Sequence, residues 1–89
     1  MTGTKNDIDR AKTIMAAELP EIATYRDEML ARCDGAPDEA TKTATINAIH
    51  ATYAEFAAET SAKKWIERSE VWSFEFDARI REIYIASQE

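Results

Sequence analysis

Few side chains in this sequence are of the types that act as nucleophiles, bases or metal ligands. His50 is the only histidine and Cys33 is the only cysteine. His50 borders an apolar face between Ile46 and Tyr53, where a general base or a pH switch is conceivable but an ordinary boundary side chain is expected. Cys33 has no CxxC partner and no histidine nearby in the sequence, so we interpret it as a buried hydrophobic residue.

Carboxylates recur at helical spacing in the second half of the chain. Bundles that bind metal ions through carboxylates use a Glu-x-x-His pattern on two helices, and this sequence has none. Glu55 and Glu59 therefore predict a solvated acidic face. The basic residues Lys63, Lys64 and Arg68 are interleaved with carboxylates, which intrahelical pairing explains. Phosphate loops, zinc knuckles and nucleophile elbows are absent. We expect no metal, no cofactor and no enzymatic activity.

The negative charge of the chain is concentrated in its middle. Residues 18–62 hold nine carboxylates and three basic side chains, which accounts for the whole formal charge of −6. Such a surface repels phosphate backbones and attracts basic proteins, although acidity that serves only solubility is an equally good reading. We expect a basic protein partner and no direct nucleic-acid contact. The candidate binding residues are Glu21, Asp27, Glu28, Asp34, Asp38, Glu39, Glu55 and Glu59.

The composition favours a small helical domain. The 89 residues include only two glycines and two prolines, and 45% are hydrophobic. A single cysteine excludes an intramolecular disulfide, and no apolar run reaches the roughly 18 residues of a membrane span. The first residues lack a signal-peptide core. We expect one domain over residues 1–89, located in the cytoplasm and not bound to membranes.

The first predicted helix covers residues 6–33, starting at Asn6 or Asp7. Pro20 interrupts its seven-residue apolar pattern without changing the phase, so either a second helix begins there or one long helix bends. Gly35 is placed to end the helix in a left-handed conformation. Pro37 is placed to begin the next helix.

The second predicted helix covers residues 37–60, with an apolar face that includes Ile46, Ile49 and Phe56. The main apolar face changes sides after residue 60. A break at Thr60-Ser61 would let both faces enter one core. Without that break, a helix of about 50 residues would need other chains to cover it.

The third predicted helix covers residues 62–87 and has two apolar stripes on opposite sides. The first stripe includes Trp65 and Trp72, for which we favour a place in the core. The second includes Val71, Phe74 and Ile85, which predict a dimer interface or a partner site. Residues 72–80 also alternate like a strand, but no hairpin partner follows.

These patterns predict an all-α fold, an antiparallel bundle of three long helices, with the first kinked or split at Pro20. The leading hypothesis is a non-enzymatic inhibitor or modulator of a basic, nucleic-acid-binding protein. Phage-encoded anti-defence (anti-CRISPR-like) inhibitors and bacterial immunity proteins use this physics, an analogy of type without sequence resemblance. The alternative is a structural homodimer or assembly component that uses the second stripe. A third hypothesis is a small helical enzyme in which Arg26, on an otherwise apolar face, would act.

Overall fold

The computed structural model describes residues 1–89, of which 82% are helical with no strand. The elements in chain order are α1 (Lys5–Arg32), a 3₁₀ turn η1 (Cys33–Gly35), α2 (Glu39–Ala57), α3 (Ala62–Arg68) and α4 (Trp72–Ser87). The all-α class is confirmed. The prediction of three long helices is wrong, because the third predicted helix is divided into α3 and α4.

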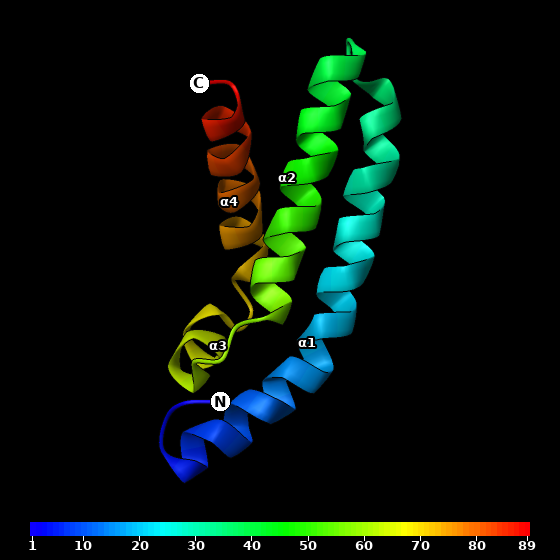
Figure 1. Cartoon of the computed structure of the whole chain (residues 1–89). Helices are drawn as coiled ribbons and strands as arrows, with labels where there is room; N and C mark the ends of the chain where they lie inside the picture. The colour runs from blue at the N-terminus through cyan, green and yellow to red at the C-terminus, as the bar shows by residue number, and fades with distance from the viewer.

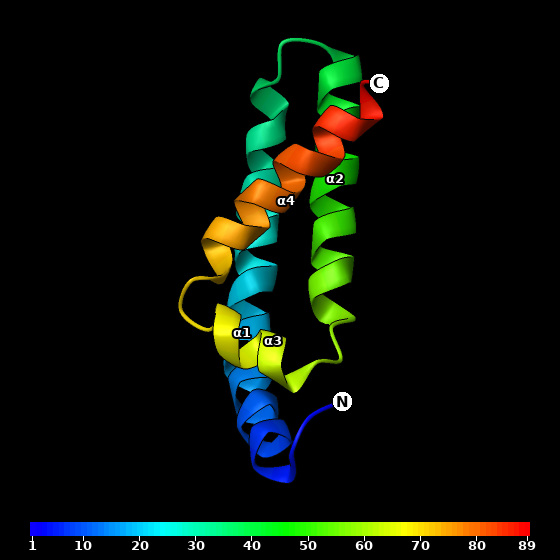
Figure 2. The same ribbon diagram turned by 90° about the vertical axis from the view of Figure 1, so that its left-hand side faces the viewer.

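Helices α1 and α2 form an antiparallel hairpin, and α3 and α4 cover one side of it (Figures 1 and 2). Helix α3 packs against α1, whereas α4 packs against α2. Figure 2 shows α4 as the front layer, crossing the hairpin diagonally. One face of α4 is thus turned towards the hairpin, and the other is turned away from it.

Helix α1 is continuous through Pro20. Figure 1 shows it bending in its lower half, so of the two alternatives at Pro20 the chain adopts one long helix that bends. The Thr24 hydroxyl donates a 3.1 Å hydrogen bond to the Pro20 carbonyl, a contact that often accompanies a helix bend. The helix begins earlier than predicted, at Lys5, because the Thr4 side chain accepts a hydrogen bond from the Asp7 N–H.

The connection between α1 and α2 differs in detail from the prediction. Gly35 does not adopt a positive φ, and the chain leaves α1 through the 3₁₀ turn instead. Helix α2 begins at Glu39 rather than Pro37 because Asp38 is its N-cap. The Asp38 carboxylate accepts a 2.7 Å hydrogen bond from the Thr41 N–H, which lowers the pKa of the Asp38 carboxyl.

The predicted break near Thr60-Ser61 is present. Helix α2 ends at Ala57, and Ser61 caps α3 by accepting a hydrogen bond from the Lys64 N–H. The N-terminal segment closes over this turn, since the Thr2 N–H donates to the Thr60 carbonyl and the Ala62 N–H donates to the Thr2 carbonyl. The break lets the apolar faces of α2 and α3 enter one core.

A second break, at residues 69–71, was not predicted. Glu70 has φ of 70°, a left-handed conformation that no glycine or asparagine signalled in the sequence. The Glu18 carboxylate from α1 accepts 3.0 Å hydrogen bonds from the Ser69 hydroxyl and the Glu70 N–H. A side chain from the first helix therefore holds the turn between α3 and α4.

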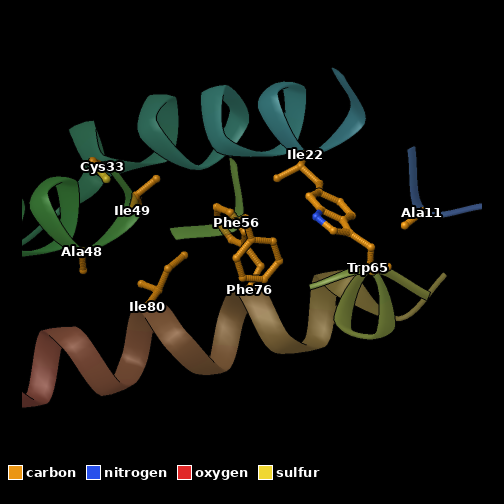
Figure 3. Packing of buried hydrophobic residues seen from close by; sticks show 10 residues of the cluster. Ala11, Ile22, Cys33, Ala48, Ile49, Phe56, Trp65, Phe76 and Ile80 are labelled. Atoms are coloured by element: carbon orange, nitrogen blue, oxygen red, sulfur yellow. The ribbon is translucent and has the colours of Figure 1, made fainter. Parts of the chain in front are cut away.

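The core runs along the length of the hairpin (Figure 3). Trp65 and Phe76 are its largest fully buried side chains, and Ile22 and Ile49 lie with them in the same cluster. The Trp65 indole N–H donates to the Glu59 carbonyl at 3.1 Å, which satisfies its polar atom. Trp72 is only half-buried, so the predicted core position holds fully for Trp65 and in part for Trp72.

Candidate functional site

The eight predicted binding carboxylates do not form one surface. Six belong to the second half of α1, to η1 or to the start of α2, and we call this group the acidic end: Glu21, Asp27, Glu28, Asp34, Asp38 and Glu39. All six are exposed. The other two are Glu55, on the side of α2 that α4 covers, and Glu59, in the turn between α2 and α3, and both form contacts within the chain.

Within the acidic end, three carboxylates have partners in the chain. Asp38 caps α2, Asp34 lies 3.2 Å from the Lys42 ammonium, and Asp27 accepts a 2.9 Å hydrogen bond from Arg26. The remaining carboxylates form no ion pair or hydrogen bond, and they are Glu21, Glu28 and Glu39. Glu21 and Glu28 are two turns apart on one face of α1, so their charges act together. Only three of the six carboxylates of the acidic end are thus without a partner in the chain.

An arginine from later in the chain, Arg79, engages Glu55. The Arg79 guanidinium donates two 2.8 Å hydrogen bonds to Glu55 and one of 3.1 Å to Glu82. This bidentate contact lowers the pKa of the Glu55 carboxyl and raises the pKa of Arg79. Glu55 joins α2 to α4 in this way and is not available as a free binding group.

Glu59 has a structural role as well. Its carboxylate accepts hydrogen bonds from the N–H groups of Thr60 and Ser61, and it lies 3.7 Å from Arg68. Burial raises the pKa of this carboxyl, but the Ser61 N–H and the charges of Lys64 and Arg68 outweigh that effect and lower it. Glu59 thereby closes the α2–α3 turn.

Arg68 is the least exposed charged residue of the chain, at 9%. Its guanidinium carbon lies 4.1 Å from the centre of the Phe56 ring. Its Nε forms an ion pair with a Glu75 oxygen at 3.2 Å, but Nε and one terminal nitrogen are buried and form no hydrogen bond. With Glu59 and Glu75 it links α2, α3 and α4. The sequence predicted pairing of Arg68 within its own helix, whereas its partners Glu59 and Glu75 lie outside α3.

An open hollow of about 460 Å³ lies above these ion pairs. Its charged lining consists of four carboxylates and three basic groups: Glu55, Glu59, Glu75, Glu82, Lys64, Arg68 and Arg79. Each of these groups lies within 4 Å of an opposite charge. The hollow therefore holds a network that ties α2, α3 and α4 together, in which every charged group is engaged by an opposite charge.

The second apolar stripe is on the face of α4 turned away from the hairpin. Phe74 is 76% exposed, Ile85 52% and Val71 44%, and with Met1 these are the large hydrophobic residues that solvent reaches most. Val71 precedes the first turn of α4 rather than lying within a longer helix. The stripe is therefore not core, and it includes three of the four large hydrophobic side chains that the chain leaves exposed.

The remaining candidate residues show no reactive setting. His50 is exposed on α2, and Cys33 is buried with its thiol donating to the Met29 carbonyl. Arg26 lies over the Tyr53 ring at 4.2 Å and pairs with Asp27, whose hydrogen bond raises the pKa of Arg26. No three potential metal ligands cluster, and none of the helices is both long and apolar enough to cross a membrane.

Comparison of the chain with protein-family models, with curated proteins and with solved structures finds no match in any of the three.

Proposed function

We propose that this protein is a small acidic binding protein whose acidic end docks on a basic protein. The observation that supports this is the charge of residues 21–42, which carry six carboxylates against three basic side chains, with all six carboxylates exposed along the second half of α1, the turn and the start of α2. Charges of this kind raise the rate of encounter with a basic surface. The α1–α2 hairpin that carries these carboxylates is formed by this chain alone.

A nucleic-acid-binding groove is the kind of basic surface that best fits the acidic end of this chain. A groove that accepts phosphates presents rows of arginine and lysine, and exposed carboxylates spaced along a helix can occupy it in place of the nucleic acid. The proposed activity is therefore inhibition or modulation of a nucleic-acid-binding protein, as in anti-defence and immunity-type inhibitors. The acidic chain itself is not expected to contact nucleic acid.

The experiment is retention of host proteins on the immobilised chain at low salt, followed by elution with a salt gradient. The proposal predicts one dominant basic protein whose nucleic-acid binding is blocked by the free chain. A column of an equally acidic, unrelated helical protein controls for simple ion exchange. Retention of the same proteins on both columns would contradict specific binding.

A second candidate function, self-association, is favoured by the exposure of Phe74 and Ile85. Exposed apolar stripes on small proteins mark interfaces, and a homodimer would cover this one. The two functions use different surfaces, since the acidic end belongs to the hairpin and the stripe belongs to α4. A dimer would consequently present two acidic ends to its partners.

A further inference from the structure

We infer that the second apolar stripe, on the outer face of α4, packs against the same stripe of a second copy of this chain. The two α4 helices are antiparallel in this contact, so that Phe74 of each copy packs against Ile85 of the other. This inference rests on the proposed self-association and adds the occupant, direction and register of the contact. It concerns a surface that the acidic end does not share.

The spacing of the stripe is symmetric about its own midpoint. Phe74, Ala78, Arg81 and Ile85 are all exposed, and they follow one another at steps of four, three and four residues along α4. Steps of three and four keep side chains on one helix face, as in the seam of a coiled coil. A two-fold axis through the midpoint places Phe74 opposite Ile85 and Ala78 opposite Arg81. The contact is then isologous, as closed dimers require.

The sizes of the side chains fit this pairing. The large residues Phe74 and Ile85 are at the two ends, and each would cover the other across the axis. Ala78 is near the middle, where a small side chain lets the helices approach and leaves room for the aliphatic part of Arg81 from the second copy. Val71, at the start of α4, extends the apolar contact by one turn.

The charges favour the antiparallel direction. Arg81 forms no ion pair within the chain, whereas Arg79, two residues earlier, is fully engaged by Glu55 and Glu82. In the antiparallel register, Arg81 lies opposite Ala78 of the second copy. Asp77 of the second copy is adjacent to that Ala78, and it lies on the same side of the helix–helix contact as Arg81. Asp77 accepts its hydrogen bond from Tyr25 through one oxygen, which leaves the other available. A parallel pair would instead bring the two Arg81 side chains together, which is unfavourable.

The size of the stripe limits the strength of the dimer. Helix α4 has 16 residues and is about 24 Å long. A single helix of this length covers less than the roughly 800 Å² per partner of a standard stable interface. The dimer is therefore weak and depends on concentration. Sedimentation velocity at concentrations up to about 1 mM should show a monomer–dimer equilibrium.

Engineered cysteine pairs test the register directly, because only cysteines that lie close together in the dimer form a disulfide. The native Cys33 is buried and should not form disulfides with the introduced thiols. An equimolar mixture of the variants Phe74→Cys and Ile85→Cys should form a disulfide-linked dimer under mild oxidation. Phe74→Cys alone should form little, since the two introduced thiols would be about 16 Å apart along the helices in this register and a disulfide requires Cα atoms within about 7 Å. Efficient cross-linking of Phe74→Cys alone would overturn the antiparallel register.

Two further variants separate the register from self-association itself. Phe74→Glu should abolish the dimer with unchanged circular dichroism, because Phe74 contributes nothing to the core. Arg81→Glu should weaken the dimer about tenfold by removing two reciprocal ion pairs, whereas Arg10→Glu, outside the stripe, should not. A wild-type chain that stays monomeric at the highest concentration would overturn self-association. If the dimer forms but its affinity is unchanged by Arg81→Glu, and cysteine pairs other than Phe74→Cys with Ile85→Cys cross-link it, only the register is overturned.

Discussion

The Glu18 carboxylate on α1 accepts a hydrogen bond of 3.0 Å from the Glu70 N–H, at the one residue other than glycine with a positive φ. The same carboxylate oxygen also accepts from the Ser69 hydroxyl. One side chain thus satisfies two donors of the turn that separates α3 from α4. This contact lets α3 pack on α1 while α4 packs on α2.

Removal of this acceptor should destabilise the fold. Glu18→Ala leaves the Glu70 N–H and the Ser69 hydroxyl without their partner, which should lower the free energy of unfolding by about 1–3 kcal/mol. Glu18→Gln keeps one acceptor and should lose less. Urea unfolding measures both, with Glu21→Ala as the control because Glu21 is exposed without a partner. Equal losses for Glu18→Ala and Glu21→Ala would refute the role of the contact.

Glycine at position 70 should stabilise the protein. A left-handed backbone costs an ordinary residue about 1–2 kcal/mol, and glycine avoids most of that strain at the cost of a more flexible unfolded chain. Glu70→Gly should therefore raise the free energy of unfolding by about 0.5–1 kcal/mol. Glu67→Gly, inside α3, should lower it by about 1 kcal/mol. If both variants lose stability alike, the turn is not held in this conformation.

The helical class and several turns follow from the sequence, but the division into α3 and α4 does not. The helices on either side of the Cys33–Pro37 turn were indicated by the low glycine and proline content and by the spacing of apolar residues. The break at Thr60-Ser61 was indicated by the change of the apolar face and by residues that can cap a helix. All these signals are local in the sequence. The break at Glu70 depends on Glu18, and the loss of Glu55 and Glu59 as binding groups depends on Arg79 and Arg68. Such contacts between residues distant in sequence leave no periodic pattern.

The Tyr25 hydroxyl donates a 2.6 Å hydrogen bond to Asp77 on α4, which raises the pKa of Tyr25 from 10.0 to about 12. Because the folded state holds the proton more tightly than the unfolded state, the stabilising effect is complete below about pH 10 and is lost as the pH rises towards 12. Tyr25→Phe should therefore lose about 1–2 kcal/mol at neutral pH. It should also show a shallower decline in stability between pH 10 and 12 than the wild type.

Thermal unfolding across that pH range checks the prediction. Tyr84→Phe is the control, because it also removes a half-buried tyrosine hydroxyl from the molecule but does not break the Tyr25–Asp77 hydrogen bond. Identical alkaline profiles for Tyr25→Phe and the wild type would show that the Tyr25–Asp77 contact does not persist in solution.

The two tryptophans should differ in their contribution to stability. Trp65 is fully buried, so Trp65→Ala should cost about 3–5 kcal/mol and Trp65→Phe a smaller amount. Trp72 is half-buried, with its ring 5.4 Å from that of Tyr25, and Trp72→Ala should cost clearly less than Trp65→Ala. Urea unfolding of both alanine variants gives the comparison, and the reverse order would contradict the observed core. If Trp65→Ala does not fold, Trp65→Phe against Trp72→Phe supplies the same test.

The central claim is that the acidic end steers a basic protein, and the association rate constant for that protein tests it most directly. Glu21→Lys combined with Glu28→Lys should slow association about tenfold or more at low salt while dissociation changes little, because exposed charges act mainly on the encounter. Asp9→Lys combined with Glu67→Lys changes the net charge equally, but near the start of α1 and in α3, outside the acidic end, and should have a much smaller effect. Added salt should slow wild-type association and narrow the difference between the variants. Equal association rates for the two double variants, or a wild-type rate that does not respond to salt, would contradict the claim.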